Sequence, residues 1–154
     1  MWPEMSAELD ATSSIQAQCE WLCEGLDSLS GPMCAAFSAR MWALQDVLVR
    51  PVALPQEEAW WRAWFDKLVT LLRAEPEDPM CVALAVGIAR WGQASGVDEA
   101  TQRLAMEALG WACRDVLPER TPPAVLGAME LRAALLQRVW PRVARDRSGT
   151  GRAE

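Results

Sequence analysis

Helix-breaking residues recur roughly every 15 to 20 residues along this chain, and between them the apolar side chains follow helical spacing. The breakers are "SGP" at 30–32, "RPVALP" at 50–55, "EPEDP" at 75–79, Gly96 and "PERTPP" at 118–123. No segment alternates apolar and polar residues over the length of a strand. The sequence therefore predicts an all-α fold, a single compact domain of about six helices with short connections.

The helix boundaries follow from capping residues and prolines. We expect the glycine of "SGP" to adopt a left-handed conformation at the end of the first helix. The expected helices run from a Ser13 or Ser14 cap to Leu29, from Pro32 to Leu48, from Pro55 to Arg73, from Pro79 (Asp78 cap) to Gly96, from 99 to 117 (Asp98 cap), and from Pro122 (Thr121 cap) to Val143. Around this helical domain, 13–143, we expect a flexible N-terminus, 1–12, and a disordered tail, 144–154.

Tryptophan supplies almost all of the aromatic content, with nine tryptophans, two phenylalanines and no tyrosine in 154 residues. Three of them lie in "EEAWWRAWFDKLV", residues 57–69. Trp61 and Trp64 share one helical face with the neighbouring leucines, which is typical of core residues. Trp60 lies one step off that face, where its ring could border a groove. We predict that Trp60, Trp64 and Trp91 border one cavity between the third and fourth helices.

The fourth expected helix is rich in small residues, and its interior glycine, Gly87, costs about 1 kcal/mol of helix stability relative to alanine. Small side chains let a neighbouring helix approach closely, but they also leave room for a ligand beside Trp91. A buried indole needs a partner for its N–H, and water or a ligand in a cavity would supply one. The candidate ligand-binding residues are Trp60, Trp61, Trp64, Trp91 and Trp111.

The charge of the chain argues against a nucleic-acid partner, because the net charge is -6 and phosphate binding needs a basic patch. Lys67 is the single lysine. The C-terminal arginines are interpreted as a solvated helix end and tail: Arg132, Arg138, Arg142, Arg145, Arg147 and Arg152. No apolar run is long enough for a membrane helix, and the first residues lack the features of a signal peptide. We therefore expect a cytoplasmic protein without a membrane partner.

The residues that usually carry catalysis are sparse. The chain has no histidine, which excludes His-based triads and metal sites. Its five cysteines, at 19, 23, 34, 81 and 113, are expected to be free thiols, because the count is odd and no set of four zinc ligands is present. No glycine-rich phosphate loop is found. We expect a protein that is not an enzyme and that needs no metal or cofactor.

A family resemblance rests on the middle of the chain: Trp64, Leu68, the turn "EPEDP", Leu84-Ala85 and Arg90-Trp91. This pattern resembles the TipA-type antibiotic-recognition domain at the C-terminal end of some MerR-type regulators, which albicidin-binding resistance proteins carry without a DNA-binding half. The similarity extends loosely over residues 37–140. The resemblance implies a helical domain that sequesters a ligand, and not a complete transcription factor.

Two hypotheses about function remain open at this point. In the first, the chain is a binding module that buries an aromatic or amphipathic small molecule in a tryptophan-lined helical cavity, for drug sequestration or sensing. In the second, it is a small acidic protein-interaction module, such as a chaperone, adaptor or immunity protein, whose exposed tryptophans are hot spots for a protein partner. The sequence leaves the oligomeric state open.

Overall fold

The computed structural model describes residues 14–46, 54–75 and 77–153, with side chains in the last helix described as far as Arg145. Within these ranges the chain forms six α-helices, one short 3-10 helix and no strand, which confirms the all-α prediction. The elements are α2 (Ile15–Ser28), α3 (Ser30–Gln45), α4 (Glu58–Arg73), α5 (Pro79–Ala94), α6 (Glu99–Val116), η1 (Pro118–Arg120) and α7 (Pro123–Ala153). The predicted flexible segment 1–12 and the predicted end of the second helix at Leu48 lie outside the described residues.

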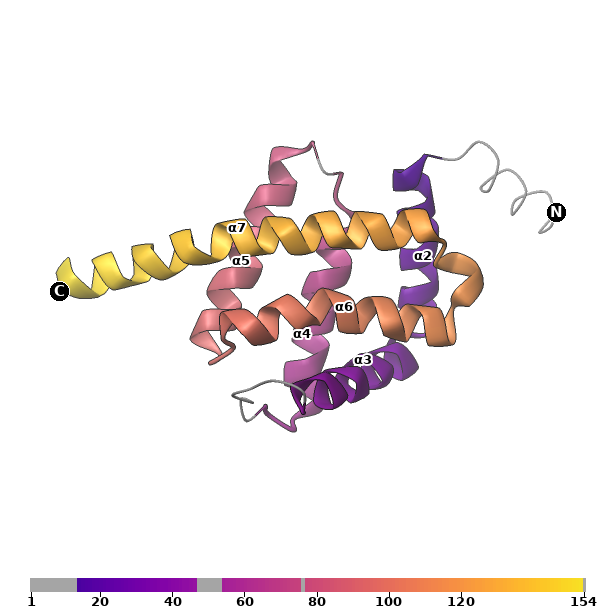
Figure 1. The fold of residues 1–154 in the computed structure, drawn as a ribbon, viewed down its shortest axis with the longest axis horizontal. Helices are drawn as coiled ribbons and strands as arrows, with labels where there is room; N and C mark the ends of the chain where they lie inside the picture. Colours follow the sequence, from indigo (N-terminus) through magenta and orange to yellow (C-terminus); the bar gives the residue numbers. More distant parts are fainter. Residues whose placement is uncertain (1–13, 47–53, 76, 154) are drawn as a thin grey trace.

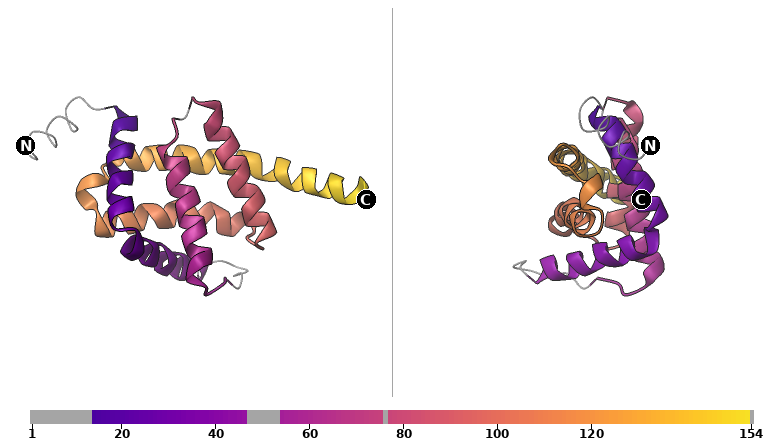
Figure 2. Two further views of the ribbon diagram at one scale, coloured as in Figure 1. Left: turned by 180° about the vertical axis from the view of Figure 1, so that it is seen from behind. Right: turned by 90° about the vertical axis from the view of Figure 1, so that its right-hand side faces the viewer.

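The helices form two layers that cross each other (Figure 1). One layer holds α6 and α7 side by side, and the other holds α2, α4 and α5, over which α7 runs. Figure 2 shows α6 and α7 nearly end-on beside the second layer, with α3 along one end of the molecule, where it packs against α6 and α4. The core fills the space between the layers with fully buried leucines, among them Leu22, Leu26, Leu68, Leu72 and Leu109.

Three helices begin at the capping residues that the sequence indicates. The Ser14 hydroxyl accepts a hydrogen bond from the Ala17 N–H at 3.1 Å. The Asp78 carboxylate accepts one from the Met80 N–H at 2.9 Å, and the Asp98 carboxylate accepts one from the Thr101 N–H at 2.7 Å. Each bond satisfies a donor that the helix itself leaves free, so these starts were predictable from local chemistry.

Two connections differ from the predictions. Gly31 lies within the first turn of α3 and does not adopt a positive φ; among the described residues Gly96, after α5, does so at 84°. The left-handed cap predicted at "SGP" is therefore wrong, because Leu29 alone separates α2 from α3. The second difference concerns Thr121, which the sequence predicts to cap the last helix. Its hydroxyl instead donates to the Leu117 carbonyl at 2.8 Å, at the end of α6.

The last helix is longer than predicted. It continues to Ala153, past the expected end near Val143 and through most of the segment 144–154 that the sequence predicts to be disordered. Pro141 lies inside this helix. A proline removes one backbone donor, but arginine and alanine, which recur after Pro141, favour a helix, and α7 continues past Pro141 and past Gly149 and Gly151.

Arg132 is not part of a solvated helix end, as the sequence analysis assumed, because only 2% of it is exposed. Its guanidinium donates to the carbonyl oxygens of Leu71 at 3.3 Å and Ala74 at 2.6 Å, at the C-terminal end of α4, and to that of Ala128 at 3.2 Å. The last carbonyls of a helix lack partners within the helix and carry partial negative charge. Arg132 therefore caps α4 from α7 and joins the two layers.

The five cysteines are free and buried. Burial raises the pKa of the Cys23 thiol to about 12 and has the same effect on Cys113, because a thiolate is poorly solvated in the core. Burial also raises the pKa of Cys19 and Cys34. These thiols stay protonated and unreactive in the folded protein at neutral pH.

We expect alkaline pH to destabilise the fold through Cys23 and Cys113. In the unfolded chain a thiol loses its proton near its ordinary pKa of 9.0, whereas the folded protein holds it until about 12. Between these values the folded state binds more protons, so the free energy of unfolding falls as pH rises. Urea melts at pH 8 and pH 10.5 check this. A Cys23→Ala/Cys113→Ala variant should show a smaller difference between the two melts, and an equal difference would contradict the assignment.

Candidate functional site

Four of the five predicted site residues come together where α4 meets α5. The ring centroid of Trp60 lies 5.0 Å from that of Trp61, 5.3 Å from that of Trp64 and 5.3 Å from that of Trp91. The rings of Trp64 and Trp91 are 6.1 Å apart, and those of Trp61 and Trp64 stack at 5.8 Å. We call these four residues the indole cluster. The contact of Trp64 with Trp91 places these two residues at similar heights on neighbouring helices.

Two members of the cluster are core residues. Trp61 is 4% exposed and Trp64 is fully buried, and both rings meet the edge or face of Phe37 from α3. The Trp61 indole N–H donates to the Pro55 carbonyl at 2.8 Å. The Trp64 N–H has no hydrogen-bond partner within the described ranges. Trp60 and Trp91 are half-buried at the edge of the core. The cluster is therefore tightly packed, and its rings occupy the space that the sequence analysis assigned to a cavity.

A groove does lie between α4 and α5, beside Trp91. It has a volume of about 470 Å³. Of the three tryptophans predicted to border a cavity here, Trp91 is the one that lines this groove. The lining residues are Ala63, Asp66, Lys67 and Thr70 from α4, and Leu84, Gly87, Ile88 and Trp91 from α5. The indole of Trp91 thus forms one wall, and Ala63 and Gly87 add no bulky side chain to the lining.

Of the two charged side chains that line the groove, Asp66 forms an ion pair and Lys67 forms none within the part of the chain that the structure describes. Asp66 forms an ion pair with Arg62 on the next turn of α4, with 3.4 Å between the Arg62 Nε and a carboxylate oxygen. Lys67 forms no ion pair with a described residue, and its ammonium nitrogen lies 5.7 Å from the centroid of the Trp91 ring. The groove therefore combines an aromatic wall with an unpaired positive charge.

The two glycines of α5 have different roles. A Cβ atom at Gly92 would lie 3.2 Å and 3.3 Å from ring carbons of Trp140, so this glycine allows α7 to approach α5 closely. A Cβ atom at Gly87 would meet no atom within 4 Å. Helix packing requires the glycine at 92 but not the one at 87, where the open space belongs to the groove.

Alanine at these two positions is expected to shift stability in opposite directions. Gly87→Ala should raise the free energy of unfolding by about 0.5–1 kcal/mol, the difference in helix propensity, because nothing opposes the added methyl group. Gly92→Ala should lower it, because the buried Trp140 ring must move. Urea denaturation of the two variants beside the wild type checks both signs. A loss of stability in Gly87→Ala would show that the site is packed more closely than the structure indicates.

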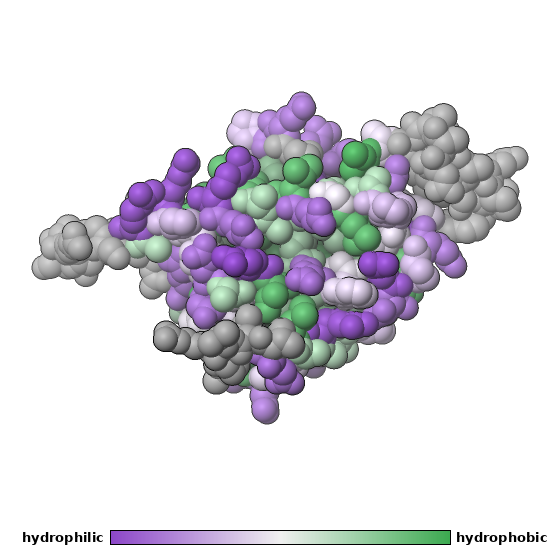
Figure 3. All heavy atoms as spheres, viewed as in Figure 1, coloured by the Kyte–Doolittle hydropathy of each residue, from purple (hydrophilic) through white to green (hydrophobic). Residues whose placement is uncertain are grey.

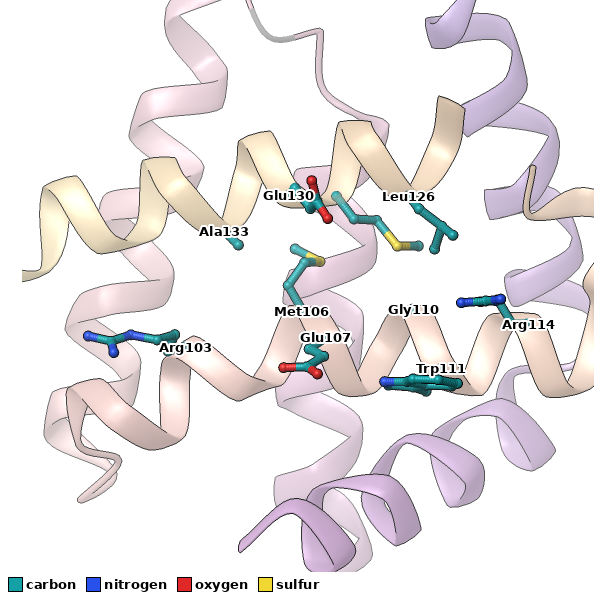
Figure 4. A pocket seen from close by; sticks show the side chains of 10 residues that line it. Arg103, Met106, Glu107, Gly110, Trp111, Arg114, Leu126, Glu130 and Ala133 are labelled. Carbon is teal, nitrogen blue, oxygen red and sulfur yellow. The ribbon is translucent and has the colours of Figure 1, made fainter. Parts of the chain in front are cut away.

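Trp111, the fifth predicted residue, lies away from the indole cluster, in a second groove between α6 and α7 (Figure 4). This groove has a volume of about 350 Å³. Met106, Gly110, Leu126 and Met129 line it, together with the charged residues Arg103, Glu107, Arg114 and Glu130. On this face of the molecule, patches of apolar surface are interspersed with hydrophilic side chains (Figure 3).

The ring of Trp111 is 41% exposed, but two cations already cover it. The guanidinium carbons of Arg40 and Arg114 lie 5.4 Å and 5.2 Å from the ring centroid. Arg40 is fixed in turn by an ion pair with Asp115. A ligand that stacked on Trp111 would have to displace these side chains. Among the described residues a single cation, Lys67, lies over the ring of Trp91, which makes Trp91 the better stacking surface.

Sequence reasoning found Trp91 but missed Lys67. The signal that could have identified it is its rarity, since it is the single lysine, together with its place three residues after Trp64.

In the described part of the chain, no three His, Cys, Asp or Glu side chains are grouped as metal ligands, and none of the helices is long and apolar enough to cross a bilayer. Comparison with protein families, with curated proteins and with solved structures finds no match for this chain.

Proposed function

We propose that this chain is a non-catalytic binding module of the cytosol, which holds a flat aromatic small molecule in the groove between α4 and α5. The biological outcome would be sequestration or sensing of that molecule. The resemblance of residues 64–91 to the TipA-type drug-binding domain points in the same direction. The indole cluster supplies the binding surface, although the ligand lies beside Trp91 and not among the rings.

The observation that carries this proposal is the combination of Trp91 and Gly87 on one side of the groove. Trp60 and Trp64 pack against Trp91 and hold its ring in place, so a planar ligand would meet a pre-formed surface. Gly87 keeps the neighbouring turn of α5 open at a cost in helix stability that packing does not explain. The volume of about 470 Å³ is within the range of small-molecule sites, roughly 300–1,000 Å³.

A fluorescence titration with the neutral planar probe N-phenyl-1-naphthylamine tests the proposal. Gly87→Leu places a side chain in the groove without a clash in the folded protein, since the space beside Gly87 is open. Gly127→Leu is the matched control, because Gly127 is also a helical glycine with open space around it and lines no groove described above. Wild type and Gly127→Leu should bind the probe, and Gly87→Leu should bind at least about tenfold more weakly. Equal binding by all three proteins would overturn the proposal.

The protein-interaction hypothesis is the second candidate, and the exposure of Trp111 favours it. Trp111 and the 65% exposed Leu131 both lie on the α6–α7 layer, and exposed tryptophans are common hot spots at protein interfaces. In this case a protein retained by the immobilised chain should be lost with Trp111→Ala and kept with Gly87→Leu. The opposite pattern would assign the binding to the groove beside Trp91.

A further inference from the structure

We propose that the ligand of the α4–α5 groove is an anion, a planar aromatic molecule with a carboxylate or sulfonate group, and that Lys67 selects it by charge. This inference rests on the proposed function and specifies the class of ligand. It concerns Lys67, whose part in binding neither the tryptophan pattern nor the family resemblance indicates.

The first step is the balance of charge in the groove. Lys67 and Asp66 are the two charged residues among those that line it. Arg62 pairs with Asp66, and 41% of the Arg62 side chain and 62% of the Asp66 side chain are exposed, so this pair lies at the solvent side. The charge that remains without a counter-ion is the ammonium group of Lys67. Although the chain is acidic as a whole, the groove presents a local positive charge.

The second step is the place of that ammonium group relative to the aromatic wall. It lies 5.7 Å from the Trp91 centroid, so a molecule stacked on this ring brings its own substituents within reach of the lysine. The lysine side chain is half-buried but flexible, and a lysine ammonium group 5.7 Å from a ring centroid is held only weakly, so a carboxylate or sulfonate can replace this contact. A cationic ligand would instead be repelled by Lys67 and would find Asp66 already paired.

The test compares two probes that share one aromatic framework and differ in charge: 1-anilinonaphthalene-8-sulfonate and the neutral N-phenyl-1-naphthylamine. The wild type should bind the sulfonate several-fold more tightly. Lys67→Gln should remove that preference, because it should weaken the binding of the sulfonate several-fold more than the binding of the neutral probe, and Lys67→Arg should keep most of the preference. Added salt should weaken sulfonate binding to the wild type more than to Lys67→Gln.

The outcomes separate this inference from the proposed function. If Lys67→Gln binds the sulfonate as tightly as the wild type, while Gly87→Leu binds neither probe, the groove is the site but selection of an anion is overturned. If neither probe binds the wild type, both proposals fall.

A second measurement uses the single lysine directly. The sulfonate probe should slow the acylation of Lys67 by an amine-reactive ester, measured by mass spectrometry, with the α-amino group as the internal reference. An unchanged rate of Lys67 acylation at saturating probe would also overturn the inference.

Discussion

Trp64→Ala is expected to lower the free energy of unfolding by about 3–5 kcal/mol, the range for truncation of a buried large side chain. Trp64 has no exposed surface, and its ring packs against Phe37, Trp60, Trp61 and Trp91. Its N–H has no partner among the described residues, so no hydrogen bond is lost, and the effect comes from the lost burial of the ring and the cavity that remains. The measurement is a urea melt followed by far-ultraviolet circular dichroism, which does not depend on tryptophan emission.

Trp60→Ala is the matched control from the preceding turn of the same helix. Trp60 contacts the same cluster but is half-buried, so its truncation opens space to solvent and should cost about 1–2 kcal/mol. Equal losses in the two variants would show that Trp60 belongs to the core. Far-ultraviolet spectra at low urea establish that each variant is folded before the melts are compared.

Arg132→Ala is expected to lower the free energy of unfolding by about 3 kcal/mol, because it removes the side-chain donor to the Ala74 carbonyl and one of the two donors to the Leu71 carbonyl, and it leaves a gap where α7 packs on the end of α4. The charge of Arg132 is balanced by these carbonyls, since it forms no ion pair with a described residue. Arg132→Lys should give an intermediate loss, because a single ammonium group cannot reproduce the geometry of the planar guanidinium.

Arg138→Ala is the control for Arg132, because Arg138 is an exposed arginine on the same helix. Its removal should change the free energy of unfolding by less than about 0.5 kcal/mol. If Arg132→Ala costs no more than Arg138→Ala in parallel urea melts, the bridge from α7 to the end of α4 contributes nothing to stability.

The helices and their starts could be predicted from the sequence because local chemistry decides them. Ser14, Asp78 and Asp98 cap helices through hydrogen bonds to residues two or three positions further on. The burial of Trp61 and Trp64 follows from helical spacing in the same way. The contact of Trp64 with Trp91 follows from the short turn between α4 and α5, which places these helices side by side.

The position of the groove and the burial of Arg132 depend on how the two layers cross, which local spacing does not specify. Trp111 joins neither the indole cluster nor its groove, because α6 lies in the other layer. A signal for Arg132 does exist, since it lies four residues after Ala128 and four before Leu136 on the buried face of α7. An arginine at the centre of an apolar stripe indicates a backbone or carboxylate partner across the interface.

The rings of the indole cluster lie close enough together for their electronic excitations to be coupled. With ring centroids between 5.0 and 6.1 Å apart, and Trp42 a further 6.0 Å from Trp61, excitation absorbed by one indole passes to its neighbours before it is emitted. A ligand that touches Trp91 alone should therefore quench light absorbed by five tryptophans. The coupled rings should also give a split band in near-ultraviolet circular dichroism, and a change at any one ring should alter the whole band.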